Sequence, residues 1–102
     1  MLTIKPNCEC CDIDLPADST AAYICSYECT FCVDCVDNVL HNVCPNCGGG
    51  FSSRPIRPAY AHRAGISREH QKPSSERVLS SYSKEEMRAF SQNIARTAPH
   101  LR

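Results

Sequence analysis

The chain has 102 residues, enough for one small domain and a tail, and its formal net charge is zero. Nine residues are cysteines, a density that indicates a scaffold of metal ions or cross-links. The sequence begins without the apolar segment of a signal peptide and has no run of about 18 apolar residues. We therefore expect a cytoplasmic protein with no membrane partner, in which thiols stay reduced and paired cysteines bind metal.

The two halves of the chain carry opposite charges. Residues 1–53 contain one base against seven acids, a net charge of −6, whereas residues 54–102 contain ten bases against four acids, a net charge of +6. We divide the chain into a module at 1–53, a basic linker rich in Pro and Ser at 54–82, and a C-terminal tail at 83–102. Residues 59–82 have little periodicity, which is typical of a mobile linker.

Four cysteine pairs follow a short lead-in, in which Leu2 and Ile4 alternate with polar residues as in an edge strand or a flap. The pairs are Cys8 with Cys11, Cys25 with Cys29, Cys32 with Cys35, and Cys44 with Cys47. Two thiolates at such spacing can occupy two corners of a zinc tetrahedron, so two pairs complete one site. The four pairs therefore predict two Zn²⁺ ions. A disulfide scaffold is the alternative, and it would require a secreted protein.

Three thiols compete for the first turn, because Cys10 lies between Cys8 and Cys11. In a zinc knuckle, a tight turn with two residues between its two cysteines, backbone amides point at the sulfur atoms. We therefore take Cys8 and Cys11 as ligands. Cys10 is then a spare thiol, although its replacement of Cys8 or Cys11 as a ligand stays open.

The remaining elements of the module follow from local patterns. Residues 21–24 and a return strand through Thr30 and Phe31 predict a β-hairpin. An apolar stripe at helical spacing predicts a helix over residues 34–42 with Asp34 as N-cap. The stripe consists of Val36, Val39, Leu40 and Val43. His41 lies off the stripe and is interpreted as a surface residue, and Phe51 is the last expected core residue.

The helix decides which pairs share an ion. Its first turn carries Cys32 and Cys35. Because the helix is roughly 13 Å long, it places Cys44 and Cys47 away from these two ligands. We therefore expect site 1 to contain Cys8, Cys11, Cys32 and Cys35, and site 2 to contain Cys25, Cys29, Cys44 and Cys47. Sequential pairing is the alternative.

The complete cysteine spacing resembles that of RING-type zinc fingers, whose fourth ligand is often His where this chain has Cys29. The segments CECC, ICSYECTFCVDC and CPNCGG also resemble a small, uncharacterised bacterial family of short RING-like proteins, over about residues 2–58. The RING resemblance implies a small metal-stabilised α+β fold, a cross-brace with a β-hairpin, one central helix and two zinc sites. The bacterial resemblance implies no known activity.

The RING resemblance does not extend to the surface that ubiquitin ligases use. Those proteins dock a conjugating enzyme through an apolar residue between the first two ligands, where this chain has Glu9 and Cys10. The chain has no Trp, and Gly48 follows the last ligand where a basic residue is common. Only Pro45 agrees. Two complete four-thiol sites also leave no open coordination position, so we expect no enzyme activity.

The tail predicts a second helix over residues 83–96. Ser83 and Glu86 form a capping box, and Met87, Phe90 and Ile94 follow on one face. The tail could be a solvated extension, bind nucleic acid, or fold back on the acidic module. In the last case its bases would face acids of the module, namely Asp34, Asp37 or Glu28.

We therefore expect a structural two-zinc module that binds another macromolecule, most readily a protein. Nucleic-acid binding through the basic tail and a ligase-like adaptor are the alternatives.

Overall fold

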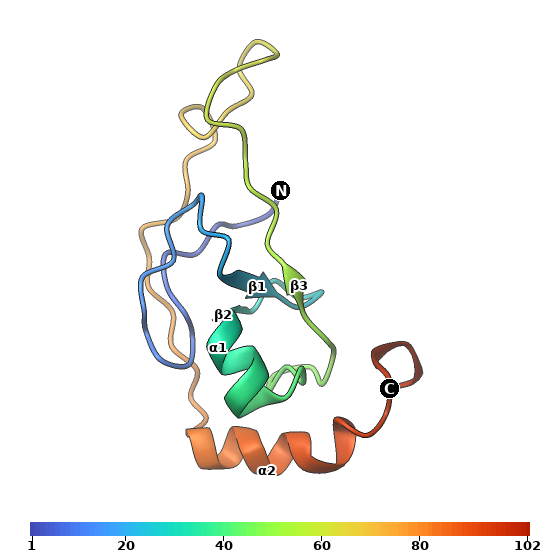
Figure 1. Ribbon diagram of the computed structural model, residues 1–102. Coiled ribbons are helices and arrows are strands. Elements are labelled where there is room, and N and C mark those ends of the chain that lie inside the picture. Colours follow the sequence, from blue (N-terminus) through green and yellow to red (C-terminus); the bar gives the residue numbers. More distant parts are fainter.

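The computed structural model describes residues 1–102 and has a three-stranded antiparallel sheet at its centre (Figure 1). Strand β1 (Ala22–Ile24) lies between β2 (Thr30–Cys32) and β3 (Ser52–Ser53). Tyr23 pairs with Phe31, so the expected hairpin is present. Strand β3 is not predicted by the sequence, because a strand of two residues is too short to show alternation.

A short helix follows β2 directly and consists of α1 (Val33–Cys35) and one wide π-helical turn, η1 (Val36–Leu40). It therefore covers residues 33–40 rather than the predicted 34–42. The helix ends early because His41 and Asn42 adopt positive φ angles of 49° and 59°. The amides of both residues donate to the Val36 carbonyl, which closes the last turn.

The predicted N-cap is wrong, but the predicted apolar stripe is buried. Cys32 occupies the N-cap position and no side chain caps the helix. Asp34 lies within the first turn, where its negative charge is favoured by the helix dipole. The buried stripe consists of Val36, Val39, Leu40 and Val43. It contributes to a core around Phe31, against which Phe51 packs edge-on with ring centroids 5.4 Å apart.

The C-terminal helix α2 (Lys84–Ile94) begins as predicted, with the Ser83–Glu86 capping box formed in both directions. It ends two residues before the predicted limit and packs across η1 (Figure 1). Met87 is buried in the module's core, whereas Phe90 is 44% exposed. A 3-10 turn, η2 (Pro99–Leu101), ends the chain. None of these helices has both the length and the apolar character needed to span a bilayer.

Residues 54–82, which the sequence predicts to be a linker, contact the module at several points. Arg54 is buried, and its guanidinium group donates to the carbonyls of Lys5, Leu15 and Pro16 at 2.8, 3.3 and 3.0 Å. These bonds hold the lead-in and the loop before β1 against the residue that follows β3.

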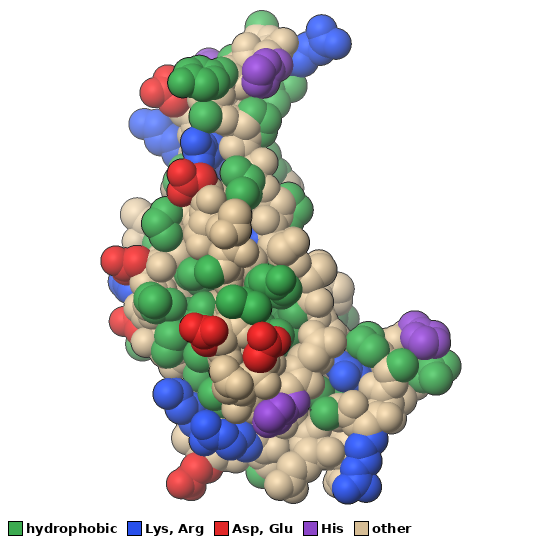
Figure 2. Space-filling model, in the orientation of Figure 1, with side chains coloured by type: hydrophobic (Ala, Val, Ile, Leu, Met, Phe, Trp, Pro, Cys, Tyr) green, Lys and Arg blue, Asp and Glu red, His purple; other side chains and the backbone are tan.

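Residues 58–71 form a loop, here called the finger, that projects from the module (top of Figure 1). Within it, Ser67 is buried and its hydroxyl group lies 2.8 Å from Nδ1 of His70. The finger exposes 77% of Tyr60 and 55% of Ile66. Figure 2 shows hydrophobic, basic, acidic and histidine side chains at this projecting end.

Candidate metal centres

Four cysteine thiols from separate parts of the chain meet at the first candidate centre, site 1. Cys8 and Cys11 lie on the loop before the sheet, Cys32 ends β2, and Cys35 ends α1. Their Sγ atoms all lie within 4.8 Å of one another, and those of Cys11 and Cys32 are 3.7 Å apart. Tetrahedral zinc with bonds of about 2.3 Å requires sulfur atoms about 3.8 Å apart. The spacing therefore suits an ion of this size.

Backbone amides point at three of the sulfur atoms in the manner of a zinc knuckle. The amides of Cys10 and Cys11 lie 3.4 and 3.5 Å from Sγ of Cys8. The amide two residues after Cys25, and the one two residues after Cys47, makes the same contact at 3.4 Å. Because a hydrogen bond to the charged form favours that form, these amides favour the thiolates that a metal ion needs.

Three thiols form the second candidate centre, site 2. The Sγ atoms of Cys25, Cys44 and Cys47 lie within 4.8 Å of one another. Cys29, the predicted fourth ligand, falls outside this limit, and its sulfur accepts a hydrogen bond from Asn46 at 3.3 Å. Burial raises the pKa of the Cys29 thiol, and its interactions with Cys25 and Cys44 place it beside the cluster. The structure thus brings three predicted ligands together and leaves the fourth next to them.

The two clusters combine the cysteine pairs in crossed order. The first and third pairs meet at site 1, and members of the second and fourth pairs meet at site 2. All nine cysteines are free thiols, so no disulfide links the pairs. Cys10 belongs to neither cluster and is half-buried, with its thiol beside that of Cys35.

Burial raises the pKa of most of the cysteine thiols whose pKa is shifted in this structure. It raises the pKa of Cys32 to about 11, and it also raises the pKa values of Cys35 and Cys44. At Cys11 burial acts in the same direction, but hydrogen bonds to the Ile13 backbone and to neighbouring thiols prevail, and the pKa is lowered. A metal ion at either site would therefore have to displace protons from buried thiols.

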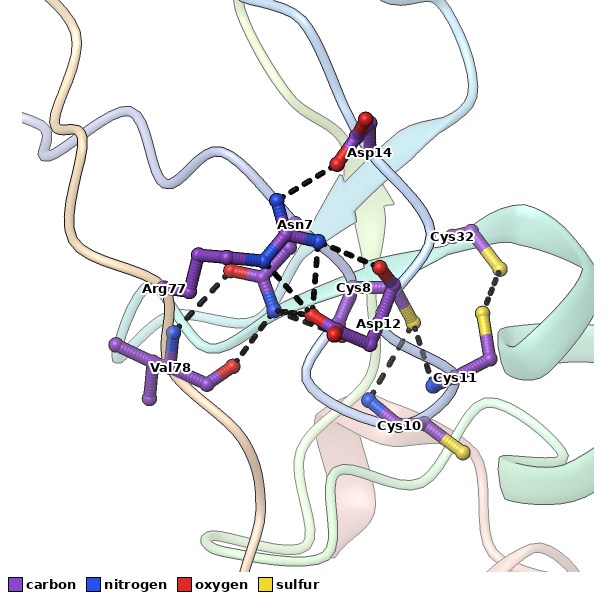
Figure 3. A network of polar contacts seen from close by, with 9 residues as sticks. All are labelled: Asn7, Cys8, Cys10, Cys11, Asp12, Asp14, Cys32, Arg77 and Val78. Carbon is purple, nitrogen blue, oxygen red and sulfur yellow. Dashed lines mark hydrogen bonds and ion pairs between the residues drawn. The ribbon is translucent and has the colours of Figure 1, made fainter.

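The structure also shows polar side chains around site 1 that sequence reasoning missed. Asn7, Asp12 and Arg77 form a network beside the loop that carries Cys8 and Cys11 (Figure 3). The only local signal is Asp12, a turn-forming residue directly after a ligand. Arg77 lies 65 residues further along the chain, so no local pattern could find it.

The acids that bind the basic half differ from those expected. Arg77 pairs with Asp12 and Asp14, and Arg68 approaches Asp18 at 3.8 Å. No ion pair joins the tail to Asp34, Asp37 or Glu28, the acids that its bases were expected to face. These three acids follow β1 in the chain, whereas the acids that pair with Arg68 and Arg77 lie on the loop that precedes it.

The fold and the sites define a small α+β protein with two clusters of cysteine thiols, each positioned to hold a metal ion. Residues 1–57 match the model of a family described as "Protein of unknown function (DUF1272)", and the chain belongs to that family. It is 59% identical over 59 residues to an uncharacterized protein of Rhizobium meliloti (strain 1021). The aligned residues cover 58% of this chain and 70% of the relative. No solved structure matches the chain. The family match includes both cysteine clusters and ends just before the finger.

Proposed function

We propose that residues 1–53 are a structural module that binds two zinc ions in a RING-like cross-brace. The observation that supports this proposal is the crossed grouping of the thiols, all of them buried except those of Cys11 and Cys47, with sulfur spacings suited to a tetrahedral ion. Soft thiolate ligands favour zinc over the hard cations Mg²⁺ and Ca²⁺. Site 1 offers four sulfur ligands, and Cys29 would supply the fourth at site 2. Neither site would then have an open position for substrate, so we assign the ions a role in folding and none in catalysis.

Elemental analysis of the purified full-length chain tests the metal content. Two zinc ions per chain are expected. Removal of both by a chelator should unfold the module, because the binding free energy of such sites is also folding free energy. Circular dichroism and the dispersion of amide resonances would follow the unfolding. A chain that holds one ion or none when freshly purified contradicts the proposal.

We further propose that this module serves a protein partner in the cytoplasm and that the finger contacts it. Tyr60 and Ile66 are exposed on a loop whose shape is held by internal hydrogen bonds. The Gln71 side chain accepts from the Ser67 amide at 3.2 Å and donates to the Gly65 carbonyl at 2.8 Å. Large apolar side chains on a loop of fixed shape lose little conformational freedom when they bind, which favours association.

A double variant, Tyr60→Ala with Ile66→Ala, tests the finger as the contact surface. Proteins captured from the native cell by the wild-type chain should be lost with this variant. Tyr27→Ala is the matched control, because Tyr27 is 75% exposed and lies on the hairpin turn, away from the finger. If the finger variant and the control retain the same specific partner equally well, the finger is not the contact surface.

Nucleic-acid binding through the basic tail is the second candidate, and it has less support. Several bases of the linker and one base of the tail already donate to carbonyl or carboxylate groups of the chain itself. They are Arg54, Arg57, Arg77 and Arg102. The seven acids of the module also disfavour the binding of phosphate by any base that lies near them. Salt-sensitive retention on nonspecific DNA or RNA would favour this candidate.

A ligase-like adaptor is the third candidate. Pro45 is the one residue that agrees with the ligase pattern, and it is buried and lines a pocket together with Tyr82, Ala89 and Phe90. Helix α2 and the residue before its N-cap therefore cover this part of the module. Binding of a ubiquitin-conjugating enzyme to the full-length chain would favour the adaptor function and argue against a role confined to the finger.

A further inference from the structure

Arg77 connects the C-terminal half of the chain to the loop that carries half of site 1 (Figure 3). Its Nη1 donates to Oδ1 of Asp14 at 2.6 Å, and its Nη2 donates to Oδ1 of Asp12 at 2.8 Å. Nη2 also donates to the Asp12 carbonyl at 2.6 Å, and Nε lies 3.1 Å from Oδ1 of the same residue. One planar guanidinium group thus fixes both the side chain and the backbone of Asp12.

Asp12 occupies the position that closes the loop. It follows Cys11 directly, its φ angle is 64°, and its amide donates to the Cys8 carbonyl at 3.0 Å. A residue other than glycine adopts this left-handed conformation only at a cost in free energy, although Asp tolerates it better than most. The contacts with Arg77 offset that cost and hold the loop in the conformation that brings Cys8 and Cys11 together.

Asn7 supports the same loop and contacts the same carboxylate oxygen of Asp12 as Arg77 does. It is fully buried, and its Nδ2 lies 3.0 Å from Oδ1 of Asp12 and 2.9 Å from the carbonyl of Val78. Its Oδ1 accepts from the amide of Val78 at 3.2 Å. The side chain therefore hydrogen-bonds simultaneously to the site 1 loop and to the backbone next to Arg77.

Residues 74–80, here called the strap, lie alongside the beginning of the chain. The Ser74 amide donates to the Ile4 carbonyl at 2.9 Å, and the Ser80 amide donates to the Glu9 carbonyl at 2.8 Å. The strap lies beyond residue 57, where the family match ends. No hydrogen bond or ion pair joins the strap to any of the cysteines of site 2.

We propose that Arg77 is a positioning residue for site 1 and that the strap thereby makes metal retention at site 1, but not at site 2, depend on the C-terminal half of the chain. This inference rests on the proposed zinc-binding function. Cys8 and Cys11 lie on an irregular loop, so their separation depends on contacts such as these. Cys32 and Cys35 are instead held by β2 and α1.

The test is the rate at which a chromogenic chelator in excess removes zinc from the loaded full-length chain. Hydrogen exchange on the same time course assigns the release phases, because residues 8–12 lose protection when site 1 empties. Arg77→Ala should release the site 1 ion about tenfold faster, the lower end of the effect usual for groups that orient metal ligands. The site 2 rate should not change. Arg77→Lys keeps the charge but not the planar fork, so it should restore part of the retention.

Arg68→Ala is the matched control, because it removes another arginine of residues 54–82 that faces an acid of the module, Asp18, away from the site 1 loop. Asp12→Asn should accelerate release at site 1, and the double variant with Arg77→Ala should add little. The inference is overturned if Arg77→Ala leaves both rates unchanged, accelerates both equally, or acts no more strongly than Arg68→Ala. If the wild-type chain holds two ions in these cases, the proposed function survives. A wild-type chain with no ion at site 1 overturns both.

Discussion

Glu9 and Thr30 hold the two halves of site 1 together. The Glu9 amide donates to the Thr30 carbonyl at 2.9 Å, and the Thr30 amide donates to a carboxylate oxygen of Glu9 at 2.5 Å. Glu9 lies between Cys8 and Cys11, and Thr30 precedes Cys32 by two residues. This reciprocal pair sets the loop against β2 and explains why the sulfur atoms of Cys11 and Cys32, 21 residues apart in sequence, lie 3.7 Å apart.

Replacement of Glu9 should therefore destabilise the module. Glu9 is 5% exposed, and its charge is paired with Lys5 at 3.1 Å. Glu9→Ala leaves the buried Thr30 amide without a partner, which should lower the free energy of unfolding by about 1–3 kcal/mol. Glu28→Ala is the control, because the Glu28 carboxylate contacts an exposed backbone amide. Chemical denaturation of the zinc-loaded variants measures the difference, and equal losses for both would contradict a special role for Glu9.

Substitution should distinguish the zinc ligand Cys11 from the spare thiol of Cys10. Cys10→Ser should retain two zinc ions, because the Cys10 sulfur belongs to neither cluster. Cys11→Ser should lose the ion at site 1, since the variant leaves three sulfur ligands there. Native mass spectrometry counts the ions directly. Loss of zinc from Cys10→Ser but not from Cys11→Ser would mean that Cys10 is the ligand.

Metal binding should depend steeply on pH. Burial raises the pKa of Cys32 to about 11 and also raises those of Cys35 and Cys44, so these thiols are protonated at neutral pH without metal. Zinc must displace their protons, and the apparent affinity should therefore rise with pH from neutrality towards 11 and fall in acid. Each proton released contributes about a factor of ten per pH unit. Calorimetric titration in buffers of different ionisation enthalpy counts the protons, and no proton release would contradict the prediction.

Features determined by neighbouring residues were predictable. The capping box of Ser83 and Glu86 is one turn of helix, and its hydrogen bonds form as its spacing predicts. The crossed order of the cysteine pairs followed from the length of one helix. The expected N-cap at Asp34 is wrong because β2 leads straight into α1 and Cys32 takes that position.

Features determined by distant contacts were not predictable. Arg54 looks like any other base in a basic segment, yet it is 3% exposed and bonded to carbonyls from residues 38 to 49 positions away. Arg77 and Asp12 differ in sign, but so do many other pairs in two halves of opposite charge. A charge count predicts that such halves attract, and it does not specify which residues meet.

Met87 should determine whether α2 stays on the module. Met87 is 2% exposed within the core, whereas no ion pair joins α2 to the module. Met87→Ala removes buried apolar contact worth about 2–5 kcal/mol, enough to release a helix whose only other buried residue is the small polar Ser91. Hydrogen exchange should then show residues 84–94 unprotected, with both zinc ions retained. Phe90→Ala, at a side chain that is 44% exposed, should leave the protection largely intact.

Because the contact is apolar, 1 M salt should not detach α2 from the wild-type chain. Detachment by salt alone, or full protection in Met87→Ala, would show that charge and not Met87 holds the helix.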